Sequence, residues 1–266
     1  MIGVSDTQPT AEKYAAAGPC LLGPITDETA QRRAAAVAHA LATSRDLDLL
    51  LNDNVPTEGA HTLPESHRES HSSSTTSVAT GTALDPAVSQ YNPSTVVVKR
   101  NTEQRLLDEL FSDRAERLSA QTDVLTVDGR GEADRIASIL VPIAGGDHSQ
   151  LAVETGVALA AANDAAVDLF HVIEDDSDAA RDRGQTLLQS ALASVPDDTD
   201  RVDTWLYEAP NAPEAIIEQS SYYDLTVMGA PTDNPLERFV FGSTSKQVQR
   251  EADSPVIVAH AKAGTR

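Results

Sequence analysis

Two glycines and three hydroxyl residues near the C-terminal end of the chain have a spacing that suits anion binding. The stretch is VMGAPTDNPLERFVFGSTSK, residues 227–246. Its relevant members are Gly229, Thr232, Gly242, Ser243 and Thr244. Glycines let the backbone turn and approach an anion closely, and a helix that begins at residue 242 or 243 adds the positive end of its dipole. The pattern predicts a phosphate-binding loop, or glycines that only end a strand and start a helix.

Five short apolar runs rich in branched residues must position this loop. They are residues 139–143, 167–173, 202–207, 225–228 and 256–259. Continuous runs of this kind suit strands that are buried on both faces of a parallel sheet. Helical patterns separate them at 149–162, at 178–195, from Asn211 and from residue 242 or 243. The alternation predicts a doubly wound α/β domain with its ligand site at the carboxyl ends of the strands.

The first half of the chain repeats this order with a period of roughly 120 residues, which indicates two copies of one domain. LLGPIT at 21–26 resembles ILVPIA at 139–144, and TDVLTVD at 122–128 resembles SPVIVAH at 254–260. We therefore predict two five-stranded, Rossmann-like parallel-sheet domains in tandem. The expected boundaries are an N-terminal extension at 1–18, a first domain at 19–128, a linker at 129–137 and a second domain at 138–261.

Within the first domain, residues 53–82 are polar and of low complexity. We predict a disordered loop there, in place of the helix and strand that the second copy has between 178 and 207. His61, His67 and His71 lie in this segment, but their spacing fits no defined zinc pattern.

The composition limits the partners. The chain has 41 acidic and 20 basic residues, a formal charge of −21, and its basic residues are mostly arginine. Such a surface repels nucleic acid and anionic lipid. It is typical of proteins from salt-loving cells, the alternative being one unusually acidic mesophilic protein. No signal peptide or membrane-spanning run is visible, so we expect a soluble, cytoplasmic protein without membrane insertion, in which the single cysteine, Cys20, is a buried apolar residue.

The second copy resembles the universal stress protein family. The resemblance rests on ILVPIAGGDHS at 139–149, on FHVI at 170–173, and on the loop G-x-x-G-(nine residues)-G-[ST], whose spacing fits Gly229, Thr232, Gly242 and Ser243. It implies that this loop, with Thr244 and with Ala144 and Val172 at the ends of the first two strands, lines a site for ATP or another adenine nucleotide. His171 is expected to be structural or to line the same pocket.

The sequence departs from that family pattern at two positions. Thr232 replaces a glycine and resists positive φ, and Ala144 replaces the aspartate that ends the first strand in nucleotide-binding members. A lost polar contact weakens binding by about 1–3 kcal/mol. The equivalent loop of the first copy, residues 98–117, has no glycine, so we expect an ordinary charged helix and a degenerate, structural domain.

The resemblance also implies how the copies assemble. Family members commonly pair through their last strands, which predicts that 122–127 lies beside 255–260 in an intrachain pseudo-dimer, or that these strands form a homodimer. Trp205 is expected to be a core or interface anchor.

The expected function is a stress-response or regulatory binding module, not an enzyme. Asp147, His148 and Ser149 are adjacent, which does not allow the usual catalytic relay. The alternative is a regulatory protein that binds no nucleotide and associates with a membrane transporter. Slow ATP hydrolysis is a third hypothesis, and it lacks a visible general base.

Overall fold

The computed structural model describes residues 18–23, 28–52, 75–78, 84–99, 115–128, 130, 135–196, 201–231 and 244–264. The strands are β1 (Cys20–Leu22), β2 (Leu49–Asn52), β3 (Thr75–Val78), β4 (Thr95–Lys99), β5 (Asp123–Val127), β6 (Ser138–Pro142), β7 (Ala166–Ile173), β8 (Val202–Glu208), β9 (Leu225–Gly229) and β10 (Val256–His260). The helices are α2 (Glu28–Ser44), α4 (Leu84–Tyr91), α6 (Gly146–Asn163), α7 (Asp178–Leu192), α8 (Ala212–Ser220) and α10 (Thr244–Glu251).

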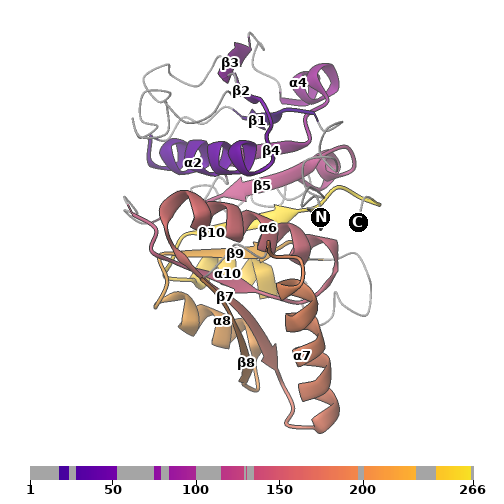
Figure 1. Cartoon of the computed structure of the whole chain (residues 1–266), viewed down its shortest axis with the longest axis vertical. Coiled ribbons are helices and arrows are strands. Elements are labelled where there is room, and N and C mark those ends of the chain that lie inside the picture. The colour runs from indigo at the N-terminus through magenta and orange to yellow at the C-terminus, as the bar shows by residue number, and fades with distance from the viewer. Residues whose placement is uncertain are drawn as a thin grey trace, which may run out of the picture.

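All the strands belong to one ten-stranded sheet with the order β3-β2-β1-β4-β5-β10-β9-β6-β7-β8 (Figure 1). Read outward from the middle, both halves have the same strand order, which confirms the predicted α/β class. Every neighbouring pair is parallel except β5 and β10, which are antiparallel with Val127 opposite Ile257 and Leu125 opposite Ala259. The predicted intrachain pairing of 122–127 with 255–260 is therefore confirmed. It also gives each of these strands two neighbours, so neither offers a free edge.

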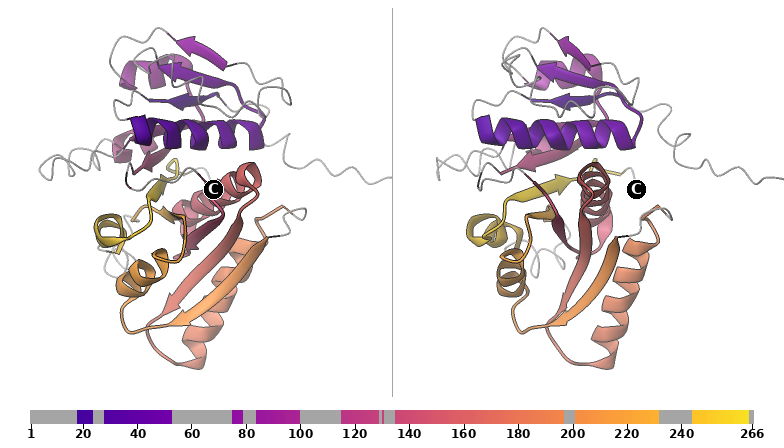
Figure 2. Two further views of the ribbon diagram at one scale, coloured as in Figure 1. Left: turned by 90° about the vertical axis from the view of Figure 1, so that its left-hand side faces the viewer. Right: turned by 60° about the vertical axis from the view of Figure 1, so that its left-hand side comes forward.

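The two faces of the sheet are covered differently. On one face a single apolar core runs through both halves and includes Ala34 of α2 and Leu159 of α6. On the other face there are two separate cores, one beneath α8 and α10 and one beneath α4. Figure 2 shows α7 on the opposite side of the sheet from α8 and α10. The two halves thus share one core on the first face of the sheet, and each half has its own core on the other face.

The second half follows its sequence pattern closely. All five predicted strands are present, and α8 begins with the expected cap, because the side chain of Asn211 accepts a hydrogen bond from the backbone N–H of Glu214 at 3.2 Å. In the first half, Cys20 is fully buried, as predicted, and burial raises its thiol pKa to about 12. No helix in the part of the chain that the structure describes is both long and apolar enough to cross a membrane.

The structure corrects two expectations. The prediction of residues 53–82 as a loop without a strand is wrong at β3, which pairs with β2. An edge strand needs only backbone hydrogen bonds and one neighbour, so its side chains can be polar, and three of its four residues, Thr75, Thr76 and Val78, are β-branched. Of the two expectations for Trp205, the core position is wrong, because β8 is the opposite edge strand and the residue is 40% exposed, while the interface anchor stays a prediction. Of the predicted helix at 98–117, residues 98 and 99 belong instead to β4, residues 115–117 are helical, and residues 100–114 fall outside the described residues. The three histidines of the polar segment fall outside them as well.

The seam between the halves contains a buried arginine. Arg45, directly after α2, donates a hydrogen bond from Nη2 to Oε2 of Glu154 on α6 at 2.9 Å and from Nη1 to Oγ1 of Thr95 at 2.8 Å. Its Nη1 also lies 3.9 Å from Oδ2 of Asp123. The guanidinium therefore joins a strand and a carboxylate of the first half to a helix of the second.

A contact between two histidine rings of the second half predicts a pH effect. The ring of His260 lies edge-on to that of His148, with 6.4 Å between centroids. Burial, and then the electrostatic interaction with the His148 ring, lower the pKa of His260 to about 4. The unfolded side chain titrates near pH ~6.5. Because the folded pKa is depressed, the neutral ring contributes stability above about pH 6.5, and this contribution is lost as the pH falls through about 4.

We expect NMR titration to show the His260 ring neutral down to about pH 4. The control is His148→Asn, which should raise this pKa only slightly, since burial is the larger cause. A titration midpoint between pH ~6 and ~7, the ordinary range for histidine, would contradict the desolvation of the His260 ring.

Candidate functional site

The pocket lies at the carboxyl ends of β6, β7 and β9, where the N-terminal ends of α8 and α10 meet them. Its free space is about 630 Å³, including the part that is open to solvent. Parallel strands with helices on their faces bind ligands at this edge, because the loops diverge there and helix N-termini point inward. The location matches the ligand site that the strand pattern predicts.

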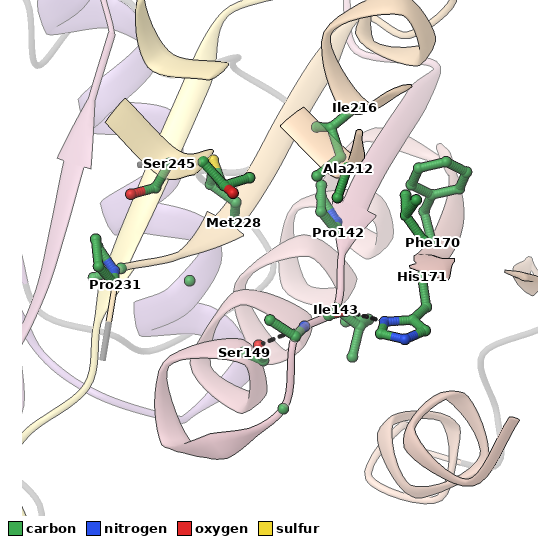
Figure 3. A pocket seen from close by; sticks show the side chains of 16 residues that line it. Pro142, Ile143, Ser149, Phe170, His171, Ala212, Ile216, Met228, Pro231 and Ser245 are labelled. Carbon is green, nitrogen blue, oxygen red and sulfur yellow. Dashed lines mark hydrogen bonds between the residues drawn. The ribbon is translucent and has the colours of Figure 1, made fainter. Parts of the chain in front are cut away.

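The floor of the pocket is apolar. Pro142, Phe170 and Met228 come from the three strands, and Ala212 and Ile216 come from successive turns of α8. Figure 3 shows Phe170 and His171 pointing in opposite directions from β7, as neighbours on a strand must. These flat and branched side chains suit the face of an aromatic ring or another apolar group.

A tight turn from β6 into α6 forms one wall. Gly145 and Gly146 have φ angles of 93° and 75°, which side chains rarely adopt, so this turn requires glycine. The backbone N–H of Ala144 donates a hydrogen bond to Oγ of Ser149 at 3.1 Å. At Gly229, an added Cβ would lie 2.9 Å from backbone atoms of His148 and Ser149. Gly229 therefore does more than end a strand: it lets β9 approach the start of α6.

The opposite wall is the first turn of α10. Ser245 lines the pocket and is 2% exposed, yet its hydroxyl has no hydrogen-bond partner among the residues that the structure describes. A buried hydroxyl without a partner costs about 1–3 kcal/mol. Its position at a helix N-terminus, where backbone N–H groups also lack intrahelical partners, favours an acceptor such as a phosphate oxygen. The wall is thus polar where the floor is apolar.

His171 supports the turn from behind. Its Nδ1 lies 2.7 Å from the carbonyl oxygen of Ile143, and a carbonyl can only accept, so Nδ1 carries the proton and donates. The side chain is buried against α7, at Gly184. Both expectations for His171 fit this arrangement, since the residue lines the pocket and its ring fixes the residue that precedes Ala144.

Comparison with known protein families identifies the family to which the second half of the chain is similar. A model of the universal stress protein family matches residues 135–260. Residues 135–260 form a universal stress protein domain. The match starts three residues before β6 and ends with β10, so it contains the whole pocket.

Solved structures extend the likeness in fold over both halves. A universal stress protein from Archaeoglobus fulgidus DSM 4304 is 14% identical, with a TM-score of 0.57, over 94% of this chain and 98% of its own. The cytoplasmic domain of a prokaryotic cation chloride cotransporter is 16% identical, with a TM-score of 0.60, over 94% and 97%. A functionally unknown protein from Pseudomonas aeruginosa PAO1 is 18% identical, with a TM-score of 0.54, over 91% and 92%. No curated protein matches the chain.

The universal stress protein domain brings four of the seven predicted residues together. Ala144, Val172, Gly229 and Thr244 all line the pocket, from four different elements or their ends. Thr232, Gly242 and Ser243 lie outside the described residues. The role of all seven in ligand binding stays a prediction.

Two of the adjacent residues Asp147, His148 and Ser149 make structural hydrogen bonds. Oγ of Ser149 accepts from Ala144, as above, and Nδ1 of His148 accepts from the backbone N–H of Ala261 at 2.9 Å. Neither residue is arranged as a nucleophile or base toward the other. Among the residues that the structure describes, no group of three or more histidines, cysteines or carboxylates is placed to hold a metal ion.

Sequence reasoning missed Ser245 and the apolar floor. Ser245 ends the run GSTS, and a helix start at residue 242 or 243 already places it in the first turn, so this signal was available. Ala212 and Ile216 are four residues apart on α8 and hence share one face of the helix. What the sequence did not reveal is that this face turns toward the end of β7.

Proposed function

We propose that the universal stress protein domain at 135–260 binds an adenine nucleotide, and that the whole chain is a cytoplasmic binding module rather than an enzyme. In this proposal the first half, residues 19–128, is a degenerate copy of the same domain with a structural role. The first half supplies β5, its own last strand, which pairs with β10, the last strand of the second half.

The observation that carries the proposal is the pocket itself. Its apolar floor provides a surface for a base, and its polar wall presents the unpartnered hydroxyl of Ser245 at the N-terminus of α10. A nucleotide has the same two parts, an aromatic ring and an anion, joined across a few ångströms. Four of the residues implied by the family resemblance, Ala144, Val172, Gly229 and Thr244, line the same pocket.

The charge of the lining bears on the affinity. His171 is the only titratable side chain among the described residues that line the pocket, and none of these residues is a lysine or an arginine. The described part of the lining therefore offers a phosphate only backbone N–H groups and hydroxyls. A site held by these groups alone is weaker for ATP than one with lysine or arginine at the phosphate, because charge-assisted hydrogen bonds are roughly twice as strong as neutral ones.

Isothermal titration calorimetry of the full chain with ATP and with AMP, in molar KCl, tests the proposal. We expect saturable binding to the wild type and none to Gly242→Val, which alters the predicted cradle. The control is Ala263→Val, an exposed position near the C-terminal end whose φ is not positive. No heat at millimolar nucleotide, or equal binding by wild type and Gly242→Val, would refute it.

A second candidate is a regulatory module that binds no nucleotide and contacts a membrane transporter. The absence of a cationic side chain from the described pocket lining favours it. So does the likeness, along almost the whole chain, to the cytoplasmic domain of a cotransporter. Calorimetry without any nucleotide signal would leave this candidate as the better one.

A further inference from the structure

One arginine in the segment between the two halves is bonded to the end of α10. Arg130 donates from Nη2 to the carbonyl oxygen of Gln249 at 2.6 Å, and from Nη1 to those of Ala252 at 3.1 Å and Arg250 at 3.3 Å. The last carbonyls of a helix have no partner within the helix and carry partial negative charge. A guanidinium has enough donors in one plane to satisfy several of them at once.

The guanidinium is itself held in place. Nε of Arg130 donates to Oδ2 of Asp128 at 2.5 Å, and its backbone N–H donates to Oδ1 of the same carboxylate at 2.9 Å. Asp128 is completely buried. Because both oxygens of this carboxylate bind Arg130, the arginine is fixed relative to the backbone that follows β5.

The first half of the chain holds the same segment. Nη1 of Arg33, on α2, donates to the carbonyl oxygens of Asp128 at 2.6 Å and of Arg130 at 2.7 Å. Arg33 is 7% exposed, so these bonds form away from solvent. A continuous series of contacts therefore runs from α2, through residues 128 and 130, to the C-terminal end of α10.

The other end of α10 is the pocket wall. Thr244 and Ser245 begin the helix and line the pocket, and Glu251 ends it. The helix has only eight residues, about two turns, and packs through the fully buried Val248. A shift of its C-terminal end that carried the whole helix would displace the Ser245 hydroxyl.

We infer that Arg130 is a positioning residue of the pocket, and that the first half of the chain controls ligand affinity in the second through Arg33, Arg130 and α10. The inference rests on the proposed function where it concerns the ligand. It assigns the degenerate half a regulatory role in addition to its structural one: whatever binds near α2, or shifts it, changes the pocket some distance away.

Hydrogen exchange of the full chain without ligand tests the mechanical part. In Arg130→Ala and Arg33→Ala we expect the amides of α10 to exchange about 10-fold faster, because each variant removes hydrogen bonds made by a charged donor. Amides of α8 should change by less than about twofold, the effect of a few tenths of a kcal/mol. The milder variants Arg130→Lys and Arg33→Lys should fall in between, and they serve if an alanine variant does not fold.

The matched control is Arg181→Ala. Arg181 lies on α7, makes two carboxylate contacts, with Asp176 and with Glu208, and touches no part of α10 that the structure describes. It should leave α10 exchange unchanged. The inference is overturned if α10 exchange is unaffected by the Arg33 or Arg130 variants, or if exchange rises equally throughout the chain.

Nucleotide affinity supplies the readout that a merely structural role would not move. Trp205 is the single tryptophan, and its ring centroid lies 5.5 Å from that of Phe170, which lines the pocket, so its fluorescence can follow binding of ATP or AMP. We expect Kd to rise about 10-fold in Arg130→Ala and Arg33→Ala and to stay unchanged in Arg181→Ala.

The two measurements separate the two proposals. If the wild type binds no nucleotide, the proposed function fails, while hydrogen exchange still decides whether Arg33 and Arg130 position α10. If the wild type binds and the two variants loosen α10 without any change in Kd, control of ligand affinity by the first half is refuted.

Discussion

Ser245→Ala should make the ligand-free protein more stable and the proposed nucleotide site weaker. The serine hydroxyl is buried without a partner among the described residues, so its removal should raise the free energy of unfolding by about 1–3 kcal/mol. If the hydroxyl binds a phosphate oxygen, its loss should weaken nucleotide binding by roughly 10- to 150-fold, the value of a hydrogen bond to a charged group. Urea denaturation and calorimetry measure the two effects.

Ser254 offers the matched control, because it is also a buried serine but its hydroxyl is satisfied. Its Oγ lies 2.8 Å from Oγ1 of Thr226, which is fully buried. Ser254→Ala should lower the free energy of unfolding by about 1–3 kcal/mol and leave nucleotide affinity unchanged. Destabilisation by Ser245→Ala with unaltered affinity would show that the Ser245 hydroxyl has a structural use instead.

The second large effect is expected at the seam. Arg45→Met keeps most of the apolar stem of the side chain but removes the guanidinium, which leaves Glu154 and Asp123 without their shared cation. Breaking a buried ion pair by removing one partner costs about 3–5 kcal/mol. We expect this loss in urea denaturation of the full chain, in one transition, since the two halves share a core.

Arg201→Met is the control for charge removal alone. Nη1 of Arg201 lies 3.1 Å from Oδ1 of Asp164, and both side chains are more than half exposed. An exposed pair contributes about 0–1 kcal/mol and is screened by salt, whereas a buried one is screened much less. If both variants lose the same stability, or if molar KCl abolishes the Arg45 effect, the seam contact is not the buried ion pair that the distances indicate.

The sequence predicted the second half well because its signals are local. Continuous branched runs predict β6 to β10, the capping residue predicts the start of α8, and the repeat predicts β1 and β5 of the first half. The pairing of β5 with β10 followed from the family resemblance. The pocket position followed from the rule that parallel sheets bind ligands at their carboxyl edge.

The missed features depend on contacts between distant segments. β3 has polar side chains and exists because β2 offers a backbone edge, which no periodicity within residues 53–82 reveals. The exposure of Trp205 follows from the edge position of β8, and the bond between Arg45 and Glu154 joins residues 109 positions apart. Such effects are decided by which elements become neighbours, and the local pattern of each segment carries little information about that.

The antiparallel pairing of β5 with β10 also changes how the assembly responds to dilution. When two separate chains meet through their last strands, mass action governs the pair, and a fall in protein concentration separates them. Here the partners are parts of one chain, and the short segment 129–137 keeps their effective concentration high whatever the bulk concentration. The pairing of β5 with β10 should therefore persist at very low protein concentration. Because the two halves are not copies of one gene product, one of them can change its surface or lose a site while the other keeps it.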